Sequence, residues 1–332
     1  MRNFKPLLPL LLFIQIFSSD ICAHETNKTQ INEDTKIENK DSDKDTENKG
    51  EDETAKGKES RIEPEKIGNF ALGPSQIPVP LSTFGENIVE KGDLIFYTAA
   101  DFISLSGRNN YNSEITPGLL YGITDDFSVF LNVPFAPKNK ERNHRSSGLE
   151  DISLQFEYAY FTKDTKSSSL QATVVGNIAF ATGSHTKTPP TGLGSINFFT
   201  GLTLTYTGVI WIYVAELGVL LPTKHRGFRA GNQYFYNAAI GKNICTTPNW
   251  IFALFAEFSG LYACKDSLNN HKDPDSGGNT ITCFPSLWIS SENLSLQLGI
   301  GLPIYQHLFG KQLKERITYS LRFGWKFDFI NK

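Results

Sequence analysis

Histidine and serine are the side chains of this sequence that could supply a catalytic base and a nucleophile. Their nearest cluster is His144, Arg145, Ser146 and Ser147. A serine hydrolase needs its hydroxyl and imidazole held within hydrogen-bond reach by regular structure. This cluster falls in a predicted polar loop near residues 135–149, where no predicted strand would fix it. The sequence therefore predicts that the chain is not an enzyme.

A metal site is not expected either. The six histidines lie in the N-terminal region or in predicted loops: His24, His144, His185, His225, His271 and His307. Three of them, His144, His185 and His225, could meet across neighbouring loops. None has the close spacing of a His-x-x-x-His pair or a cysteine nearby, which zinc sites commonly show. We expect no metal and no other cofactor.

Cysteine usage leaves two alternatives open. Cys264 and Cys283 flank a polar, glycine-rich stretch and could pair in an oxidising compartment, closing a loop on the outer side. They could equally be free thiols. Cys245 has no predicted partner, and Cys22 lies in the first apolar segment.

The first 23 residues have a basic start followed by an apolar run of about a dozen residues. A membrane-spanning helix needs about 20 apolar residues, so this run is too short to be one. Residues 1–23 are predicted to be a cleaved secretory signal peptide. Acylation of Cys22 is the alternative, but the small residues that such a site requires are replaced by Asp20 and Ile21.

Two further zones follow the signal peptide. Residues 24–66 hold 14 acidic and 9 basic residues and no aromatic residue, and are predicted to be a disordered charged tether. Residues 67–92 form a lead-in segment, and residues 93–332 carry the folded domain. From residue 67 onward, 21 basic and 20 acidic residues nearly balance without a basic cluster. Nucleic acid is therefore excluded as a partner, because phosphate binding needs a concentrated basic face.

The folded domain shows repeated alternation of apolar and polar residues. In the last segment the odd positions are apolar throughout: Ile317, Tyr319, Leu321, Phe323, Trp325, Phe327 and Phe329. On a β-strand these side chains share one face, and the charged or small residues between them share the other. A helix would scatter both sets.

Candidate strands lie near residues 93–104, 112–123, 127–133, 151–160, 170–180, 196–206, 209–222, 232–243, 250–264, 279–289, 294–302 and 317–329. Short turns and long polar loops alternate between them, as in barrels inserted from the periplasm, whose two chain ends lie on the short-turn side. A soluble β-sandwich has no reason for this alternation. The sequence predicts an all-β protein, a closed antiparallel transmembrane β-barrel of about 12 strands in a bacterial outer membrane.

The polar face of the strands supplies the candidate functional surface. Its members are Asp151, Gln155, Glu157, Gln171, Asn197, Gln297, Arg316, Arg322 and Lys326. These side chains could line a path for a small-molecule solute. Alternatively, they pair with one another and fill the interior, as happens in small barrels.

The C-terminal residues resemble the assembly signal of outer-membrane proteins. Arg322, Gly324, Phe327 and Phe329 occupy its polar, glycine, hydrophobic and aromatic positions, although three residues follow Phe329. The resemblance implies that the barrel-assembly machinery is a partner, together with the lipid bilayer of the outer membrane.

A second resemblance concerns Gly148-Leu149-Glu150-Asp151, which follows Val133-Pro134-Phe135. This pattern is similar to strand starts in the outer-membrane transporter family named for the meta pathway of phenol degradation, and the similarity could extend over residues 80–330. It implies a transport-like role and no known catalytic residues. The leading hypothesis for function is an outer-membrane channel for passive passage of small hydrophobic or aromatic solutes. The alternative is a structural or adhesin-like barrel with a closed lumen and interacting outer loops.

Overall fold

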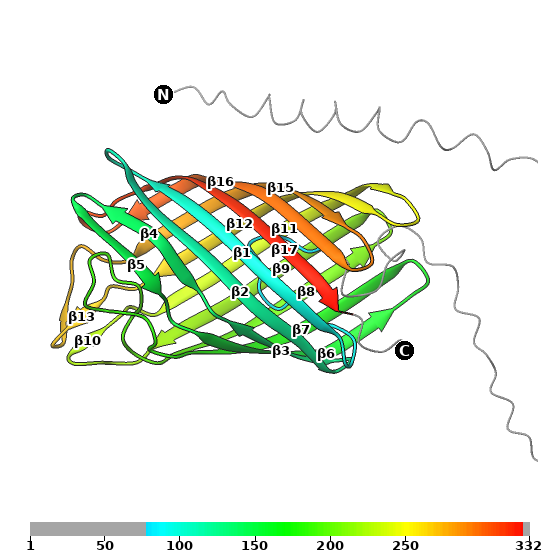
Figure 1. The fold of residues 1–332 in the computed structure, drawn as a ribbon, viewed down its shortest axis with the longest axis horizontal. Helices are drawn as coiled ribbons and strands as arrows, with labels where there is room; N and C mark the ends of the chain where they lie inside the picture. The colour runs from blue at the N-terminus through cyan, green and yellow to red at the C-terminus, as the bar shows by residue number, and fades with distance from the viewer. Residues whose placement is uncertain (1–77, 328–332) are drawn as a thin grey trace, which may run out of the picture. The chain divides into compact units, whose positions relative to one another are not determined.

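The computed structural model describes residues 78–327. Their main sheet has 14 antiparallel strands, and it closes because β1 pairs with both β17 and β2. Twelve of these strands form the barrel wall, and β4 and β5 extend it as an added hairpin (Figure 1). The prediction of a closed 12-stranded antiparallel barrel is confirmed. Within the same residues, no helix is long and apolar enough to cross a bilayer.

The barrel strands are β1 (Leu94–Leu105), β2 (Asn110–Thr124), β3 (Phe127–Asn132), β6 (Ser153–Asp164), β7 (Ser168–Ala179), β8 (Asn197–Gly208), β9 (Trp211–Pro222), β11 (Gln233–Thr246), β12 (Ile251–Ala263), β15 (Gly278–Ser290), β16 (Leu294–Leu308) and β17 (Glu315–Phe327). The added hairpin is β4 (Phe135–Glu141) and β5 (His144–Leu149), and a small separate sheet contains β10 (Phe228–Arg229), β13 (Ser267–Leu268) and β14 (His271–Lys272).

The connections differ between the two ends of the barrel. Turns of a few residues, such as 165–167 and 209–210, join strands at the end where β1 begins and β17 finishes. Longer connections, such as 180–196 and 264–277, lie at the opposite end. The β1–β2 connection, residues 106–109, is shorter than the predicted loop. We call the two ends the short-turn end and the long-loop end, and outer-membrane barrels place them in the periplasm and outside the cell, respectively.

Side chains along each strand alternate between lipid and lumen. On β8, Phe198, Leu202 and Leu204 are exposed, whereas Thr203 and Thr205 are buried. A barrel with apolar residues outside and hydroxyls inside is the arrangement that a bilayer favours, since lipid is the apolar partner and closure satisfies the strand edges.

Exposed aromatic residues mark both ends of this apolar belt. Trp211 and Phe327 lie at the short-turn end, and Tyr234 and Tyr262 lie at the long-loop end. Such residues suit the two membrane–water interfaces. Trp288 also fits that pattern in the sequence, but its side chain faces the interior and is only 6% exposed.

The interior apolar cluster explains why residues 209–222 and 250–264 are apolar at both parities. Its members are Ile212, Val214, Ala239, Ala253, Phe255 and Trp288, and Val79 packs against them. The inner faces of β9 and β12 are therefore apolar because they contact chain that precedes the barrel.

Candidate functional site

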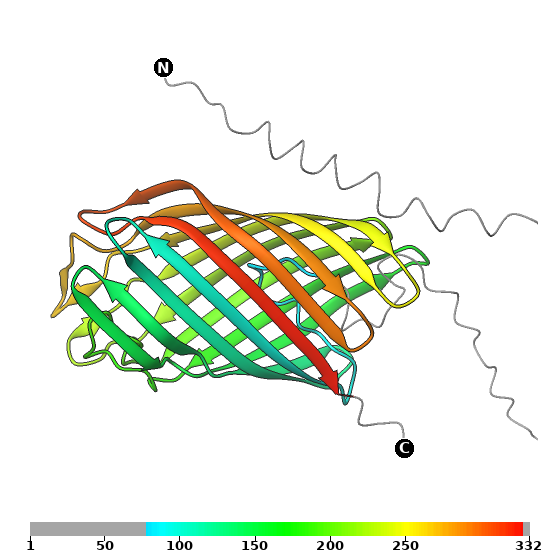
Figure 2. The same ribbon diagram turned by 45° about the horizontal axis from the view of Figure 1, so that its top comes forward.

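Residues 78–92, which we call the luminal segment, run through the interior of the barrel. Val79 contacts the apolar cluster on β9, β11, β12 and β15. At the other end, Val89 packs with Ile95, Leu120 and Phe130 on β1, β2 and β3. The segment, drawn in cyan, crosses between these walls without forming a strand (Figure 2). The sequence separated residues 67–92 as a lead-in, but it did not predict that part of them enters the lumen.

Glu257 on β12 is the first of three glutamates that hold the luminal segment. Its Oε1 accepts hydrogen bonds from the backbone N–H of Leu81 at 2.8 Å and from Ser286 Oγ at 2.7 Å. Its Oε2 accepts from the backbone N–H of Ser82 at 2.8 Å and from the Ser82 hydroxyl at 2.9 Å. All four partners are donors, which matches the acceptor-only character of a carboxylate.

Glu216 on β9 and Glu157 on β6 hold the next part of the segment. Glu216 Oε1 accepts from the backbone N–H of Phe84 at 2.9 Å. Glu157 accepts from the backbone N–H of Asn87 at 2.8 Å and from Asn87 Nδ2 at 2.7 Å. A buried backbone N–H that has no strand partner needs another acceptor, and a carboxylate makes a strong one. Side chains of the wall thus replace a strand ladder for this segment.

Gly85 allows the segment to turn against the wall. Its φ is 78°, in the region that side chains other than glycine rarely adopt. A Cβ there would lie 2.6 Å from both Thr203 Oγ1 and Val175 Cγ2. Thr203 Oγ1 also donates to Phe84 O at 2.7 Å, and Thr205 donates to Glu86. The turn is therefore fitted closely to β7 and β8.

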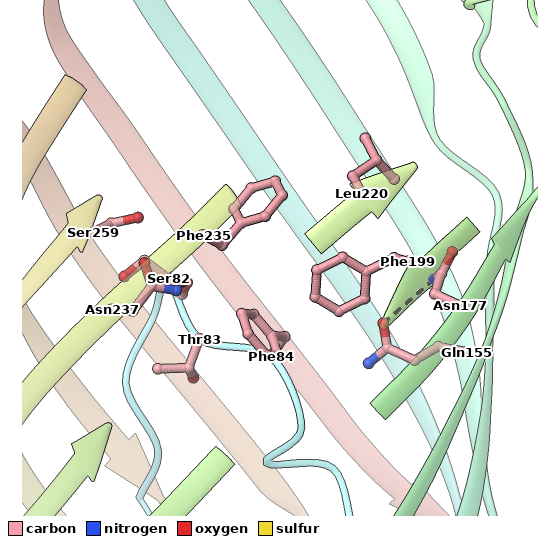
Figure 3. A pocket seen from close by; sticks show the side chains of 10 residues that line it. All are labelled: Ser82, Thr83, Phe84, Gln155, Asn177, Phe199, Leu220, Phe235, Asn237 and Ser259. Carbon is pink, nitrogen blue, oxygen red and sulfur yellow. Dashed lines mark hydrogen bonds between the residues drawn. The ribbon is translucent and has the colours of Figure 1, made fainter. Parts of the chain in front are cut away.

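A cavity of about 350 Å³ lies beside the luminal segment (Figure 3). It is lined by Ser82, Thr83, Phe84, Gln155, Asn177, Phe199, Leu220, Phe235, Asn237 and Ser259. Strands β8 and β11 both begin at the long-loop end, and Phe199 and Phe235 lie close to their first residues. The cavity therefore occupies the half of the lumen toward that end, with residues 82–84 at its base.

One side of the cavity is aromatic and another carries amides. The ring of Phe199 lies 4.9 Å from Phe84 and 5.7 Å from Phe235, edge to face in both cases. Gln155 Oε1 accepts from Asn177 Nδ2 at 3.3 Å (Figure 3). This combination offers π surfaces together with hydrogen-bonding groups, the pattern of a site that takes a mostly apolar molecule with a polar substituent.

Three of the nine sequence-predicted lumen residues contact this site. Glu157 binds the luminal segment and Gln155 lines the cavity. Gln297 donates to Val79 O at 3.1 Å and to Ser286 Oγ at 3.1 Å.

The other six lie elsewhere. Arg322 pairs with Asp101 at 2.9 Å and Lys326 pairs with Asp93 at 2.8 Å, across the β17–β1 contact. Asp151 accepts from the backbone N–H groups of Gly183 and Leu193 and so orders the connection 180–196. Gln171 donates to Thr173, Asn197 bonds with Ser195, and Arg316 is exposed.

Sequence reasoning missed Glu216 and Glu257. Each is a single acidic residue in a strand that is otherwise apolar at both parities. The sequence signal that could have found them is a lone carboxylate on a strand whose two faces are both apolar. Such a carboxylate needs hydrogen-bond donors from outside its own strand.

The C-terminal assembly-signal residues fall on both faces of β17. Gly324 is buried on the inner face, Phe327 is exposed on the outer face, and Phe329 lies outside the described residues. The predicted signal peptide and tether lie outside them as well.

The predicted pairing of Cys264 with Cys283 is wrong, since both are free thiols. Cys283 lies opposite Phe258 in the β12–β15 ladder, six residues from Cys264. At about 3.3 Å per residue this offset is ~20 Å, whereas disulfide Cα atoms lie within ~7 Å. Cys245, for which the sequence predicted no partner, lies in β11.

The predicted loop that contains His144 is also corrected, because residues 144–149 form β5. His144 is exposed and Ser146 is buried. The rings of His185 and His225 lie 5.4 Å apart. Across residues 78–327, no group of three or more His, Cys, Asp or Glu is placed to hold a metal ion.

Comparison with known proteins now gives the family. Residues 76–304 match the model of the family described as "Putative MetA-pathway of phenol degradation". The chain belongs to this family. No curated protein matches the chain.

Solved structures share the fold. A crystal structure of an outer membrane channel from Pseudomonas putida F1 matches with a TM-score of 0.61 and 14% identity, covering 75% of this chain and 100% of that one. The translocator domain of autotransporter NalP from Neisseria meningitidis has a TM-score of 0.43 and 11% identity, covering 71% and 88%. The latter likeness is too weak to carry an argument, and the former shows the fold. The closed barrel and its apolar belt place the chain in a bacterial outer membrane.

Proposed function

We propose that the chain is an outer-membrane channel for passive passage of small hydrophobic or aromatic solutes. Solutes enter from the long-loop end, occupy the cavity and pass when the luminal segment leaves its position. The cavity of about 350 Å³ above residues 82–84 is the observation that carries the proposal. The description of the family, which names phenol degradation, and the channel solved from Pseudomonas putida support it.

The cavity walls favour aromatic solutes. Phe84, Phe199 and Phe235 are arranged edge to face, and a further ring can join them in the same geometry. Each aromatic pair adds about 0.5–1.5 kcal/mol beyond the burial of its area. Gln155 and Asn177 present amide groups that can bond a polar substituent of the solute.

The way the luminal segment is held allows it to move. Its backbone bonds to Glu157, Glu216 and Glu257, and it takes no part in the barrel ladder. Release of the segment therefore breaks side-chain contacts and leaves every strand pair of the closed wall intact. The barrel does not have to open an edge, which a bilayer would penalise.

The flux of phenyl glucoside and methyl glucoside from proteoliposomes tests the solute class, because their common sugar keeps both from crossing lipid unaided. Wild type should pass phenyl glucoside faster. Replacing Phe199 and Phe235 with alanine should reduce this preference by about 2-fold to 10-fold, the equivalent of one aromatic pair. Phe258→Ala, a change at a lipid-facing phenylalanine on β12, is the control and should leave the preference unchanged.

Equal flux of the two glucosides through wild type would contradict the proposed solute class. A barrel that passes neither glucoside, even after removal of residues 24–92, would contradict the channel itself. That second result would favour the alternative, a structural or surface-interaction barrel with a closed lumen.

A further inference from the structure

A row of apolar side chains crosses β2, β4 and β5 on the outer surface of the barrel. Strand pairing places Ile115 opposite Phe135, and Phe135 opposite Leu149. Their side chains are 43%, 43% and 40% exposed. Because the outer surface of this barrel faces lipid, the row is a contact for acyl chains.

A second row lies closer to the long-loop end on the same three strands. Tyr111 pairs with Lys140, and Lys140 pairs with Arg145. Arg145 lies four residues from Leu149, an even spacing that keeps both on one face of β5. At about 3.3 Å per residue, the second row is ~13 Å beyond the first. An aromatic residue beside cations above an apolar row is typical of the headgroup level of a membrane.

The second row carries positive charge that the protein does not neutralise. Like charges directly opposite each other in a ladder are destabilising, yet Lys140 faces Arg145. In the part of the chain that the structure describes, the only ion pairs are those of Arg322 and Lys326, both on β17. Neither Lys140 nor Arg145 therefore has a carboxylate of residues 78–327 within salt-bridge distance.

A third cation reaches the same hairpin from another segment. Lys187, in the connection 180–196, donates from Nζ to Ser147 O at 2.6 Å. The Lys187 ammonium also lies 2.8 Å from the position that a Cβ on Gly148 would occupy, and Gly148 alternates with Ser147 and Leu149 along β5, so Lys187 lies toward the opposite face from Arg145. Glu141, the nearest acidic residue along β4, follows Lys140 directly and so points to the opposite face. Lys140 and Arg145 thus share the outward face of the hairpin, and neither forms an ion pair with an acidic side chain of residues 78–327.

From this arrangement we infer that the outward face of the β4–β5 hairpin binds a phosphate-bearing lipid of the outer leaflet. The phosphate bonds Lys140 and Arg145, and the acyl chains of the lipid lie along Phe135 and Leu149. Arginine and lysine are suited to phosphate, and a phosphate between Lys140 and Arg145 converts their repulsion into attraction. A lipid is the occupant because the cations stand directly above a lipid-facing apolar row.

The test uses the full chain folded into phosphatidylcholine vesicles with or without added lipid A, which carries phosphates. The variant combines Lys140→Gln with Arg145→Gln, and the control combines Lys163→Gln with Lys166→Gln at the short-turn end. Lipid A retained on the purified protein is measured by native mass spectrometry. At ~1 kcal/mol for each cation near the surface, the variant should retain lipid A about 30-fold more weakly, and the control should match wild type.

Thermal unfolding in the same vesicles gives an independent readout, because the difference in unfolding temperature between variant and wild type should depend on whether lipid A is present. With lipid A, the variant should unfold at a lower temperature than wild type, because the bound phosphate is lost. Without lipid A, the variant should be at least as stable as wild type, because the repulsion is removed. Equal retention of lipid A by variant and wild type, or the same stability difference in both vesicles, would overturn the proposal. Stabilisation of wild type by inorganic phosphate as strong as that by lipid A would also overturn it, since the site would then take a soluble anion.

Discussion

Replacing Glu257 with glutamine should release the luminal segment while leaving the barrel wall intact. Each oxygen of this carboxylate accepts one backbone N–H, from Leu81 or Ser82, and one serine hydroxyl. Whichever oxygen becomes an amide NH2 group, one backbone N–H loses its acceptor, whereas the hydroxyl beside it can rotate. A buried donor without a partner costs about 1–3 kcal/mol. A loss of ~2 kcal/mol raises the detached fraction of the segment about 30-fold.

Recordings from planar bilayers measure this change as the fraction of time that single barrels conduct. The Glu257→Gln variant should conduct more often than wild type, with the same conductance when open. Glu292→Gln makes the same chemical change in an exposed short turn and should have no effect. If folded Glu257→Gln barrels conduct no more often than wild type, the carboxylate does not hold a gate, and the reasoning fails.

Three further predictions concern the segment, the wall and the tether. Gly85→Ala should also raise the conducting fraction, because its new Cβ meets Thr203 and Val175 at a positive φ, whereas Gly176→Ala, with nothing within 4 Å of its Cβ, should not. Leu321→Arg places a charge in hydrocarbon and should destabilise the folded barrel by about 2–4 kcal/mol near the midplane, which would lower the folded fraction measured in lipid vesicles. Arg322→Gln should be tolerated better because it faces the interior, although it leaves Asp101 without its ion pair; equal tolerance would contradict the assignment of faces. Deletion of residues 24–66 should leave heat-modifiable barrel assembly unchanged, and failure to assemble would reveal a role that composition does not predict.

Much of the wall was predictable from the sequence because lipid imposes a period of two on most of its strands. The prediction for residues 170–180 compares with the observed Ser168–Ala179, and that for 196–206 with Asn197–Gly208. The β4–β5 hairpin was missed because its polar composition hides the alternation. Proximity of Cys264 and Cys283 in sequence also misled, since the ladder register, and not loop length, decides which residues face each other.

The luminal segment could not be predicted from periodicity, because residues 78–92 have no regular backbone structure. Their hydrogen bonds run from backbone N–H groups to Glu157, Glu216 and Glu257, whose spacing along the chain shows no pattern. Only the apolar inner faces of β9 and β12 hinted that something lay against them. The choice between an open and a filled lumen therefore required the structure.

The most direct test of a channel closed by the luminal segment is to lock that segment to the wall. A Cβ on residue 85 would lie 3.3 Å from Thr203 Cβ, close to the separation found in disulfides. Gly85→Cys with Thr203→Cys should therefore form a disulfide on oxidation when Val175→Ala removes the methyl group that lies 2.6 Å from that Cβ. We expect oxidised barrels to conduct rarely or not at all, and the same barrels to conduct after a reductant is added, with wild type unaffected by that reductant. Equal conductance of the oxidised and reduced variant would contradict the account, since the segment would then have no control over passage.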